Sequence, residues 1–502
     1  MEKKKRMKPG KVFYISLLII ATVVLWGVFA TDQFSRVTTA GLHWITEELG
    51  WFYVMTTALF VILCLYLAFG KYRHIKLGDD DSKPEYSFIS WIGMLFAAAM
   101  GVGLVFWGTA EPIDHYVNPP PGVEPRTAEA AQAALKYSFF HWGITPWAIY
   151  AIVGMAIAYF EFRKDRPSQI SSAFYPLIGK RAGGTSGMAI NIIATVATAI
   201  GIATTFGFSA MQLSGGLSRV FGTPNNVTVQ LIIAGTVGVL FLGVVFAGID
   251  KGMRVLSNVN LGLAALLMLA VFILGPTVSL IEDFFVALGS YIEDFAYMSL
   301  EMYPFRNTDW QAEWTLFYWG WLISWAPFVG MFIARVSKGR TIREYIFGAL
   351  ILPALLGGLW FVVFGGTAIR LEKSGAADIA SLTEGHPELA LFALLEHLPL
   401  GFVLSLLSLV LIGIFFITSA VSATYVLGVL SAKGTLHPAK KIQAIWGVAI
   451  IGIAATLLLS GGLNALQAAA VIVALPFAVI LLFMAWSLVK ALRSEPTESR
   501  QP

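Results

Sequence analysis

The hydrophobic positions of this chain gather into long uncharged runs that short polar segments separate. A helix needs about 20 apolar residues to cross a bilayer, whereas a membrane β-barrel is built from short alternating strands. The pattern therefore predicts an all-α integral membrane protein with twelve transmembrane helices. The predicted spans are residues 12–30, 51–70, 88–109, 137–160, 188–210, 228–248, 256–276, 315–334, 345–366, 401–428, 443–461 and 466–489.

Composition and charge agree with this class. The chain is 57% hydrophobic and 13% charged, whereas soluble domains are about 25% charged. If both termini are cytoplasmic, the inner segments hold 27 of the 34 Lys and Arg residues, as the positive-inside rule requires. The first run is too long for a signal peptide. The sequence predicts a multi-pass protein of the cell membrane with no nucleic-acid partner.

Glycine and proline predict where helices break. Gly101 and Gly103 interrupt the third run, and Gly320 and Pro327 lie in the eighth, five runs later. Membranes tolerate broken helices mainly around transport sites. This spacing is compatible with an inverted repeat of five plus five helices, formed by spans 3–12, and equally leaves two six-helix halves open as the alternative. The predicted parts are a basic tail (1–11), two peripheral helices (12–87), the first repeat (88–276), an external amphipathic connection (277–313), the second repeat (314–489) and a short cytoplasmic tail (490–502).

The spans lack the usual catalytic groups. No Lys, Arg, Asp or Glu lies in the middle of a run, and Glu111 stands at a run end. His141 is the one histidine within a span, and no second histidine follows it at metal-ligand spacing. A phosphate-binding loop motif is also missing. We therefore expect a transporter or channel, without a cofactor, rather than an enzyme.

Aromatic residues are concentrated in two of the spans. Trp314, Tyr318, Trp321 and Trp325 have spacings of 4, 3 and 4, which place them on one helix face, whereas Trp319 points elsewhere. An interfacial aromatic belt would explain Trp314 but not the tryptophans deeper in the span. The second group, in the fourth span, contains Trp142, Trp147 and Tyr150, and Pro146 should distort the helix between them.

Such rings suit one class of ligand. A quaternary ammonium has no N–H to donate, but the negative faces of aromatic rings attract it by about 0.5–2 kcal/mol each. A carboxylate at the other end of the ligand could bind the free N–H groups at the break near Gly101 and Gly103. A zwitterionic betaine fits both features. The hydroxyls of Thr418 and Ser419 are candidate sodium ligands, although such hydroxyls commonly bond to their own helix.

Four sequence stretches together resemble the betaine/carnitine/choline transporter family. They are GVGLVFWGTAEP (101–112), FFHWGITPWAIY (139–150), FYWGWLISWAPFVGMFIARVSKGRTIRE (317–344) and FFITSAVSATYVLG (415–428). The resemblance covers nearly the whole chain. It implies twelve helices with a ten-helix inverted-repeat core, a homotrimer, and substrates that carry a quaternary ammonium.

The resemblance also implies site residues. Where the family often has two adjacent tryptophans in the eighth span, this chain has Trp321 followed by Leu322. The implied substrate residues are Trp142, Trp147, Tyr150, Trp321, Trp325, Gly101 and Gly103. The implied main sodium site comprises Ala97, Met100, Phe415, Thr418 and Ser419. A second sodium site would use Thr198 and Phe328, but Ile202 stands where the family has its other threonine.

Two further features bear on coupling. The seventh span lacks the arginine that replaces sodium in ion-independent carnitine exchangers, and the Gly-x-Gly of sodium-coupled betaine members is intact. The resemblance therefore implies sodium-coupled glycine betaine uptake by alternating access. Proton-coupled uptake of choline or ectoine, and a channel or osmosensor without accumulation, remain alternatives. Only about a dozen residues follow the last span, so osmotic regulation through a long charged tail is not expected.

Overall fold

The computed structural model describes residues 10–99, 101–248, 250–303 and 309–495, and these are helical throughout apart from loops and one β-bridge between Lys76 and Thr341. Helices cover the described residues of each predicted span, apart from one or two residues at span ends and the interruptions at Gly101 and Gly143. The long helices are α1 (Lys11–Phe29), α2 (Thr31–Phe69), α3 (Phe88–Ala99), α4 (Val102–Val117), α5 (Ala128–Trp142), α6 (Ile144–Ala158), α8 (Thr185–Phe221), α9 (Val227–Ala247), α10 (Asp250–Leu274), α11 (Thr277–Met298), α12 (Phe317–Val336), α13 (Ile342–Phe361), α17 (Gly401–Ser431) and α18 (Lys440–Leu492).

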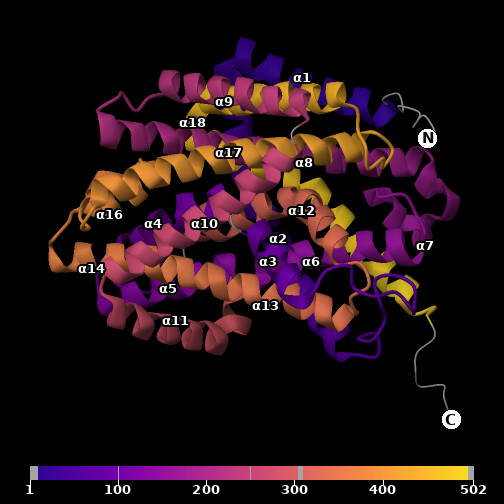
Figure 1. Cartoon of the computed structure of the whole chain (residues 1–502), viewed down its shortest axis with the longest axis horizontal. Helices are drawn as coiled ribbons and strands as arrows, with labels where there is room; N and C mark the ends of the chain where they lie inside the picture. The colour runs from indigo at the N-terminus through magenta and orange to yellow at the C-terminus, as the bar shows by residue number, and fades with distance from the viewer. Residues whose placement is uncertain (1–9, 100, 249, 304–308, 496–502) are drawn as a thin grey trace.

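Short helical segments cover the two ends of the bundle. In Figure 1, α7 lies at one end of the molecule, whereas α14 and α16 lie at the opposite end. The short segments are η1 (Tyr159–Arg163), η2 (Ile170–Phe174), α7 (Tyr175–Ile178), η3 (Gly179–Gly183), η4 (Ala312–Leu316), η5 (Val362–Gly366), α14 (Thr367–Ser374), α15 (Ile379–Thr383), η6 (Pro387–Leu389) and α16 (Ala390–Glu396).

Helix α18 contains the last two predicted spans. Gly462 has φ 57°, a left-handed value that glycine adopts readily, and it turns the chain between the two halves. The loop before α18 lies against Ser168 at Gly434, and Glu495, after α18, binds Arg163. Both ends of α18 therefore reach the same face of the bundle, and its two halves run in opposite directions.

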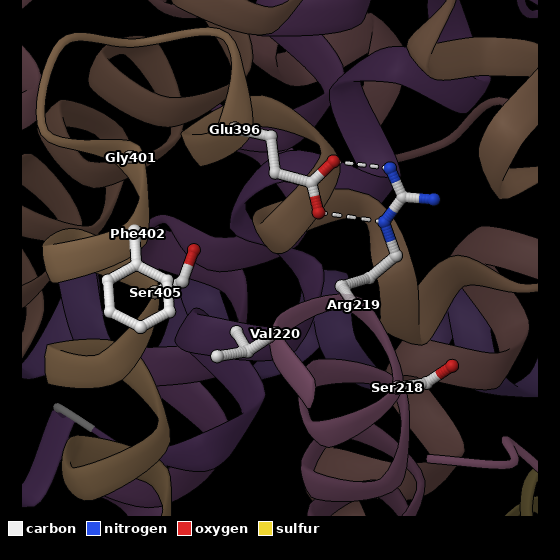
Figure 2. Close-up of a pocket in the computed structure, with 7 residues that line it drawn as sticks. All are labelled: Ser218, Arg219, Val220, Glu396, Gly401, Phe402 and Ser405. Carbon is white, nitrogen blue, oxygen red and sulfur yellow. Dashed lines mark hydrogen bonds and ion pairs between the residues drawn. The ribbon is translucent and has the colours of Figure 1, made fainter. Parts of the chain in front are cut away.

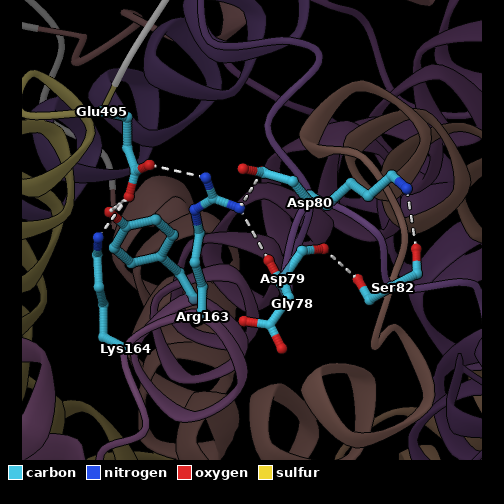
Figure 3. Close-up of polar contacts among 9 residues, drawn as sticks. Gly78, Asp79, Asp80, Ser82, Arg163, Lys164 and Glu495 are labelled. Carbon is cyan, nitrogen blue, oxygen red and sulfur yellow. Dashed lines mark hydrogen bonds and ion pairs between the residues drawn. The ribbon is translucent and has the colours of Figure 1, made fainter.

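The segments predicted to be cytoplasmic share that face. Gly10 lies against Lys433, and the Leu77 N–H donates to the Arg340 carbonyl at 2.8 Å. Figure 3 shows polar contacts on this face, where Arg163 bonds Asp80 at 2.8 Å and Glu495 at 2.8 Å. The basic segments thus meet on one side of the bundle.

Three local expectations need correction. Residues 31–50, which separate the first two predicted spans, are helical rather than a loop. They form the first part of α2, which begins at Thr31, directly after the bend at Ala30. Helix α12 is unbroken although it contains Gly320 and Pro327, and Gly320 instead lets the Val471 backbone approach closely. The fourth span breaks at Gly143 rather than at Pro146, and the Tyr291 hydroxyl accepts the hydrogen bond of the freed Ile144 N–H at 3.0 Å.

Residues 277–313 contain the amphipathic helix expected there. Helix α11 packs against α5 and α13, and ion pairs attach it at Lys136–Asp294 (2.7 Å) and Arg370–Asp283 (2.7 Å). Its opposite side exposes large apolar residues, among them Phe285 and Ile292. The helix therefore has one face on the bundle and one apolar face directed outward.

Candidate functional site: an aromatic cluster beside a broken helix

The third span is interrupted between α3 and α4. Gly101 is extended, with φ −146° and ψ 177°, and α4 begins at Val102. The first N–H groups of a helix have no partner within the helix and carry partial positive charge. Gly101 lines a cavity of about 990 Å³, so the start of α4 lies beside open space.

This cavity connects the middle of the bundle with the face that carries Arg163. Trp325 and Phe328 of α12 line it, as does Asn260 of α10. The cavity is also lined by Glu161 and Lys338, which are close in sequence to Arg163 and Arg340 on that face. A polar ligand can therefore reach Gly101 from this side.

Gly103 determines how two tryptophans meet. A Cβ atom on Gly103 would lie 2.7 Å from Cη2 of Trp321 and 2.9 Å from Cη2 of Trp142. The two indoles stand edge to face with centroids 6.0 Å apart. Only glycine leaves room for this arrangement, so the structure brings together three of the predicted substrate residues at the first turn of α4.

The aromatic stripe of α12 forms as predicted. Ring centroids are 6.0 Å apart for Trp314–Tyr318, 6.4 Å for Tyr318–Trp321 and 6.3 Å for Trp321–Trp325. Trp319 points away from the stripe and packs on Phe140. The indole N–H of Trp321 donates to the Thr205 hydroxyl, and that of Trp325 donates to the Gly201 carbonyl. These bonds fix the orientations of both rings, of which that of Trp325 lines the cavity.

The other two predicted cage residues form a separate pair. Trp147 and Tyr150 of α6 are nearly buried and contact each other edge to face at 5.5 Å. The ring contacts of the described residues do not join this pair to Trp142. The turn at Gly143 separates Trp142, on α5, from the rings of α6.

The predicted sodium ligands fall into two groups. Phe415, Thr418 and Ser419 of α17 line the same cavity as Gly101. The Thr418 hydroxyl donates to the Ile414 carbonyl at 2.9 Å, which leaves its oxygen lone pairs for a cation. Ala97 lies in α3 near the break, and Met100 lies outside the described residues.

The second predicted pair lies where α8 crosses α12. Trp321 bonds Thr205 and Trp325 bonds Gly201, so the two helices run in opposite directions there. Phe328 of α12 lines the cavity, whereas Thr198 is buried in α8. The Thr198 hydroxyl donates to its own helix at Ala194.

A buried polar cluster adjoins the tryptophans, and it was missed from the sequence. Glu111 of α4 is fully buried, and its carboxylate accepts hydrogen bonds from Trp142 (2.9 Å) and Tyr318 (2.7 Å). His141 Nδ1 lies 2.7 Å from the same carboxylate, and His115 Nε2 lies 3.3 Å from it. The spacing of four residues between Glu111 and His115 was the available signal, because it places both on one helix face.

A second, smaller pocket lies at the opposite end of the bundle. It measures about 420 Å³ and lies between the end of α8 and the start of α17 (Figure 2). Arg219 and Glu396 in this pocket form a two-pronged ion pair, so each neutralises the other. Phe402 is the one aromatic ring in its lining, and the pocket therefore does not match the predicted cage.

Comparison with known proteins agrees with this arrangement. The model of the betaine/carnitine/choline family transporters matches residues 11–497. The chain is 47% identical to the glycine betaine transporter OpuD of Bacillus subtilis, over 98% of this chain and 96% of that protein. It is 43% identical to the ectoine/hydroxyectoine transporter of Virgibacillus pantothenticus, over 98% of each chain.

This chain belongs to the betaine/carnitine/choline transporter family. A glycine betaine transporter of Acinetobacter baylyi is a further relative, 43% identical over 97% of this chain and 74% of that protein. Ten helices of the described chain are long and apolar enough to span a membrane. Helix α18 is counted once among them, although it contains two of the predicted spans. Helices α3 and α4 together correspond to one further predicted span. The protein is therefore a multi-pass membrane transporter for a small molecule and not an enzyme.

Proposed function

We propose that this family member imports glycine betaine with sodium by alternating access. The observation that carries the proposal is the meeting of Trp142 and Trp321 over Gly103, at the start of a half-helix that borders the cavity. Ring faces attract a trimethylammonium group, and the first N–H groups of α4 attract a carboxylate. One short zwitterion could engage both.

The position of the predicted sodium ligands supports coupling. Phe415, Thr418 and Ser419 share the cavity with Gly101, so an ion there would border both α17 and the break. Each sodium ion that enters down a potential of 100 mV supplies about 2.3 kcal/mol. Two ions would support roughly thousandfold accumulation of a net-neutral substrate, at about 1.4 kcal/mol per tenfold.

The alternating-access part rests on the asymmetry of the cavity. It opens on the basic face, whereas Trp107, Trp314 and Tyr318 fill the opposite side with rings 5.4–6.0 Å apart. We take the basic face as cytoplasmic, with both termini on it, so this state faces inward.

We further propose that the protein forms a homotrimer. The mass of the detergent-solubilised protein, measured by light scattering, would test this.

The decisive experiment is uptake into proteoliposomes with imposed gradients. We expect glycine betaine to accumulate electrogenically when sodium is outside, and the alanine variants of Thr418 and Ser419 to raise the sodium concentration required. Ectoine, choline and carnitine serve as competitors, because a relative is named for ectoine. Undiminished uptake in sodium-free buffer under a proton gradient would contradict sodium coupling, and equilibration without accumulation would indicate a channel.

A neutral analogue tests recognition by the rings. Replacing the trimethylammonium by a tert-butyl group keeps its size and removes its charge, so we expect a large loss of binding. Trp321→Ala should weaken glycine betaine binding by about 0.5–2 kcal/mol, whereas Trp486→Ala, at an exposed tryptophan of α18, serves as the matched control. Equal competition by the neutral analogue would contradict a cation–π cage.

Trp147→Ala locates the remaining part of the cage. If Trp147 and Tyr150 complete it, the variant should weaken substrate binding by about 0.5–2 kcal/mol, and Trp147→Phe should retain part of it. If the pair only packs α6, the variant should lower thermal stability at unchanged substrate affinity. Binding and unfolding measured on the same preparation separate these outcomes.

A further inference from the structure

We propose that Glu111, His115 and His141 form a binding site for a late first-row divalent metal ion such as Zn²⁺. One carboxylate oxygen and one nitrogen of each imidazole all lie within 4.8 Å of one another, and all three side chains are buried. Two imidazoles and a carboxylate are a donor set that zinc uses, with a fourth position left for water.

The spacing of the donors fits such an ion closely. Zinc bonds of 2.0–2.1 Å in a tetrahedron separate neighbouring ligand atoms by about 3.4 Å. Glu111 Oε1 lies 2.7 Å from His141 Nδ1 and 3.3 Å from His115 Nε2. The two imidazole nitrogens lie within 4.8 Å of each other, so all three donors reach the spacing that one ion requires after adjustments of the side chains.

His115 supplies an independent indication of a ligand. Its side chain is fully buried, its Nδ1 has no hydrogen-bond partner among the described residues, and its Nε2 has only the 3.3 Å approach to the Glu111 carboxylate. Buried polar atoms are nearly always satisfied, and exceptions call for an explanation such as an ion. A metal on Nε2 would satisfy the nitrogen that faces Glu111.

The surroundings already hold the other donors in place. Trp142 and Tyr318 bond the second carboxylate oxygen of Glu111, at 2.9 and 2.7 Å, and leave the first oxygen for the ion. The Thr315 hydroxyl lies 3.0 Å from His141 Nε2. The single proton of a neutral His141 can therefore reside on Nε2, bonded to Thr315, when Nδ1 binds metal. Such outer partners orient metal ligands.

The site also lies across moving parts of the proposed transport cycle. Its ligands belong to α4 and α5, and through Tyr318 it contacts α12. An ion here would hold Trp142 and Tyr318 in the arrangement of this inward-facing state. By mass action the metal stabilises whichever state it binds, so bound Zn²⁺ should slow uptake.

The test uses the full-length protein without a polyhistidine tag, in detergent, with Zn²⁺ or Co²⁺ as the probe. His43 and Glu47 form an exposed pair 3.0 Å apart with the same spacing in sequence as Glu111 and His115, and this pair could also bind the probe ion. The variant His43→Gln removes that pair, so it is the parent for the further variants and the control. We expect one tightly bound metal ion per chain in His43→Gln, and a loss of affinity of more than about 100-fold when His115→Gln is added.

Two measurements keep the proposal testable if the His115 variant does not fold. The visible spectrum of Co²⁺ bound to His43→Gln should show the intense bands of four-coordinate nitrogen and oxygen ligation. Zn²⁺ should also inhibit uptake by native and His43→Gln proteins alike. Absence of bound metal in His43→Gln, a six-coordinate Co²⁺ spectrum, or an unchanged metal affinity in a folded His115→Gln protein would overturn the proposal. None of these binding results depends on the identity of the transported substrate.

Discussion

Two buried glutamates, Glu111 in α4 and Glu495 just after α18, are held in opposite ways. On the basic face, Glu495 bonds two cations, Arg163 at 2.8 Å and Lys164 at 2.6 Å, together with the Tyr159 hydroxyl. Beside the tryptophans, Glu111 has only Trp142, Tyr318 and imidazoles as partners. Among the described residues, no lysine or arginine forms an ion pair with Glu111.

This difference separates two roles for a buried carboxylate. A carboxylate that is neutralised by its own cationic partners can serve to hold two segments together. Through Arg163, Glu495 connects the segment after α18 to the loop that carries Asp80 (Figure 3). A carboxylate that accepts hydrogen bonds from uncharged donors such as Trp142 and Tyr318 instead fixes the positions of those side chains. Because no cationic side chain neutralises it, it can still bind a cation. Glu111 thereby ties the orientation of the Trp142 indole to α4, the helix that begins at the break.

The largest effect is expected from Glu111→Ala. The change would leave the Trp142 indole, the Tyr318 hydroxyl and His141 without their acceptor in an apolar interior. We expect a loss of roughly 3–5 kcal/mol of stability and a strong fall in uptake. Thermal unfolding of the detergent-solubilised protein, followed by tryptophan fluorescence, measures the first quantity. Glu111→Gln, which keeps one oxygen acceptor, should lose less, and equal losses would contradict this account.

The next effect concerns the space beside the cage. Gly103→Ala places a methyl group 2.7 Å from Trp321 and 2.9 Å from Trp142, so the two rings must separate. Overpacking of this kind costs about 1–3 kcal/mol. We expect weaker glycine betaine binding, measured by tryptophan fluorescence titration. Gly93→Ala, at a position with open space around it, is the control and should bind like the parent.

A smaller effect is expected on the basic face. Arg163→Ala removes the bonds to Asp80 and Glu495 but leaves Lys164 on Glu495. Because Lys164 still pairs with the buried Glu495, and the other partner, Asp80, is 86% exposed, we expect a loss of about 1 kcal/mol that shrinks as salt is added. Denaturation at low and high ionic strength measures it. A loss as large as that of Glu111→Ala would break the contrast between the two regions.

The last effect is a dependence on pH. Burial by itself raises the pKa of Glu495, but hydrogen bonds from Arg163, Lys164 and Tyr159 outweigh it and lower this pKa from 4.5 to about 2. A lowered pKa contributes stability above pH 4.5, and this is lost as the pH falls from 4.5 toward 2. The melting temperatures of the parent and Glu495→Gln should therefore converge below pH 4.5. A constant difference would contradict this assignment.

The sequence by itself determined the membrane class, the twelve helical runs, the break at Gly101 and the aromatic face of α12. Each of these follows from local chemistry: apolar length, positions without a side chain, and the helical period of Trp314, Tyr318, Trp321 and Trp325. The same reasoning placed a break in α12, which is continuous because Gly320 serves a close helix contact instead. It also placed Pro146, rather than Gly143, at the bend of the fourth span.

Only the tertiary structure decided which distant groups meet. No spacing along the chain indicates that Trp142 and Trp321 share the space beside Gly103, because they lie far apart in the sequence, on α5 and α12. The same holds for Glu111 and His141, which were considered separately as a run-end glutamate and a lone histidine. Packing of α4 against α5 and α12 brings them within hydrogen-bonding distance. Helical periodicity fixes the face that a side chain occupies, whereas its partner depends on which helix covers that face.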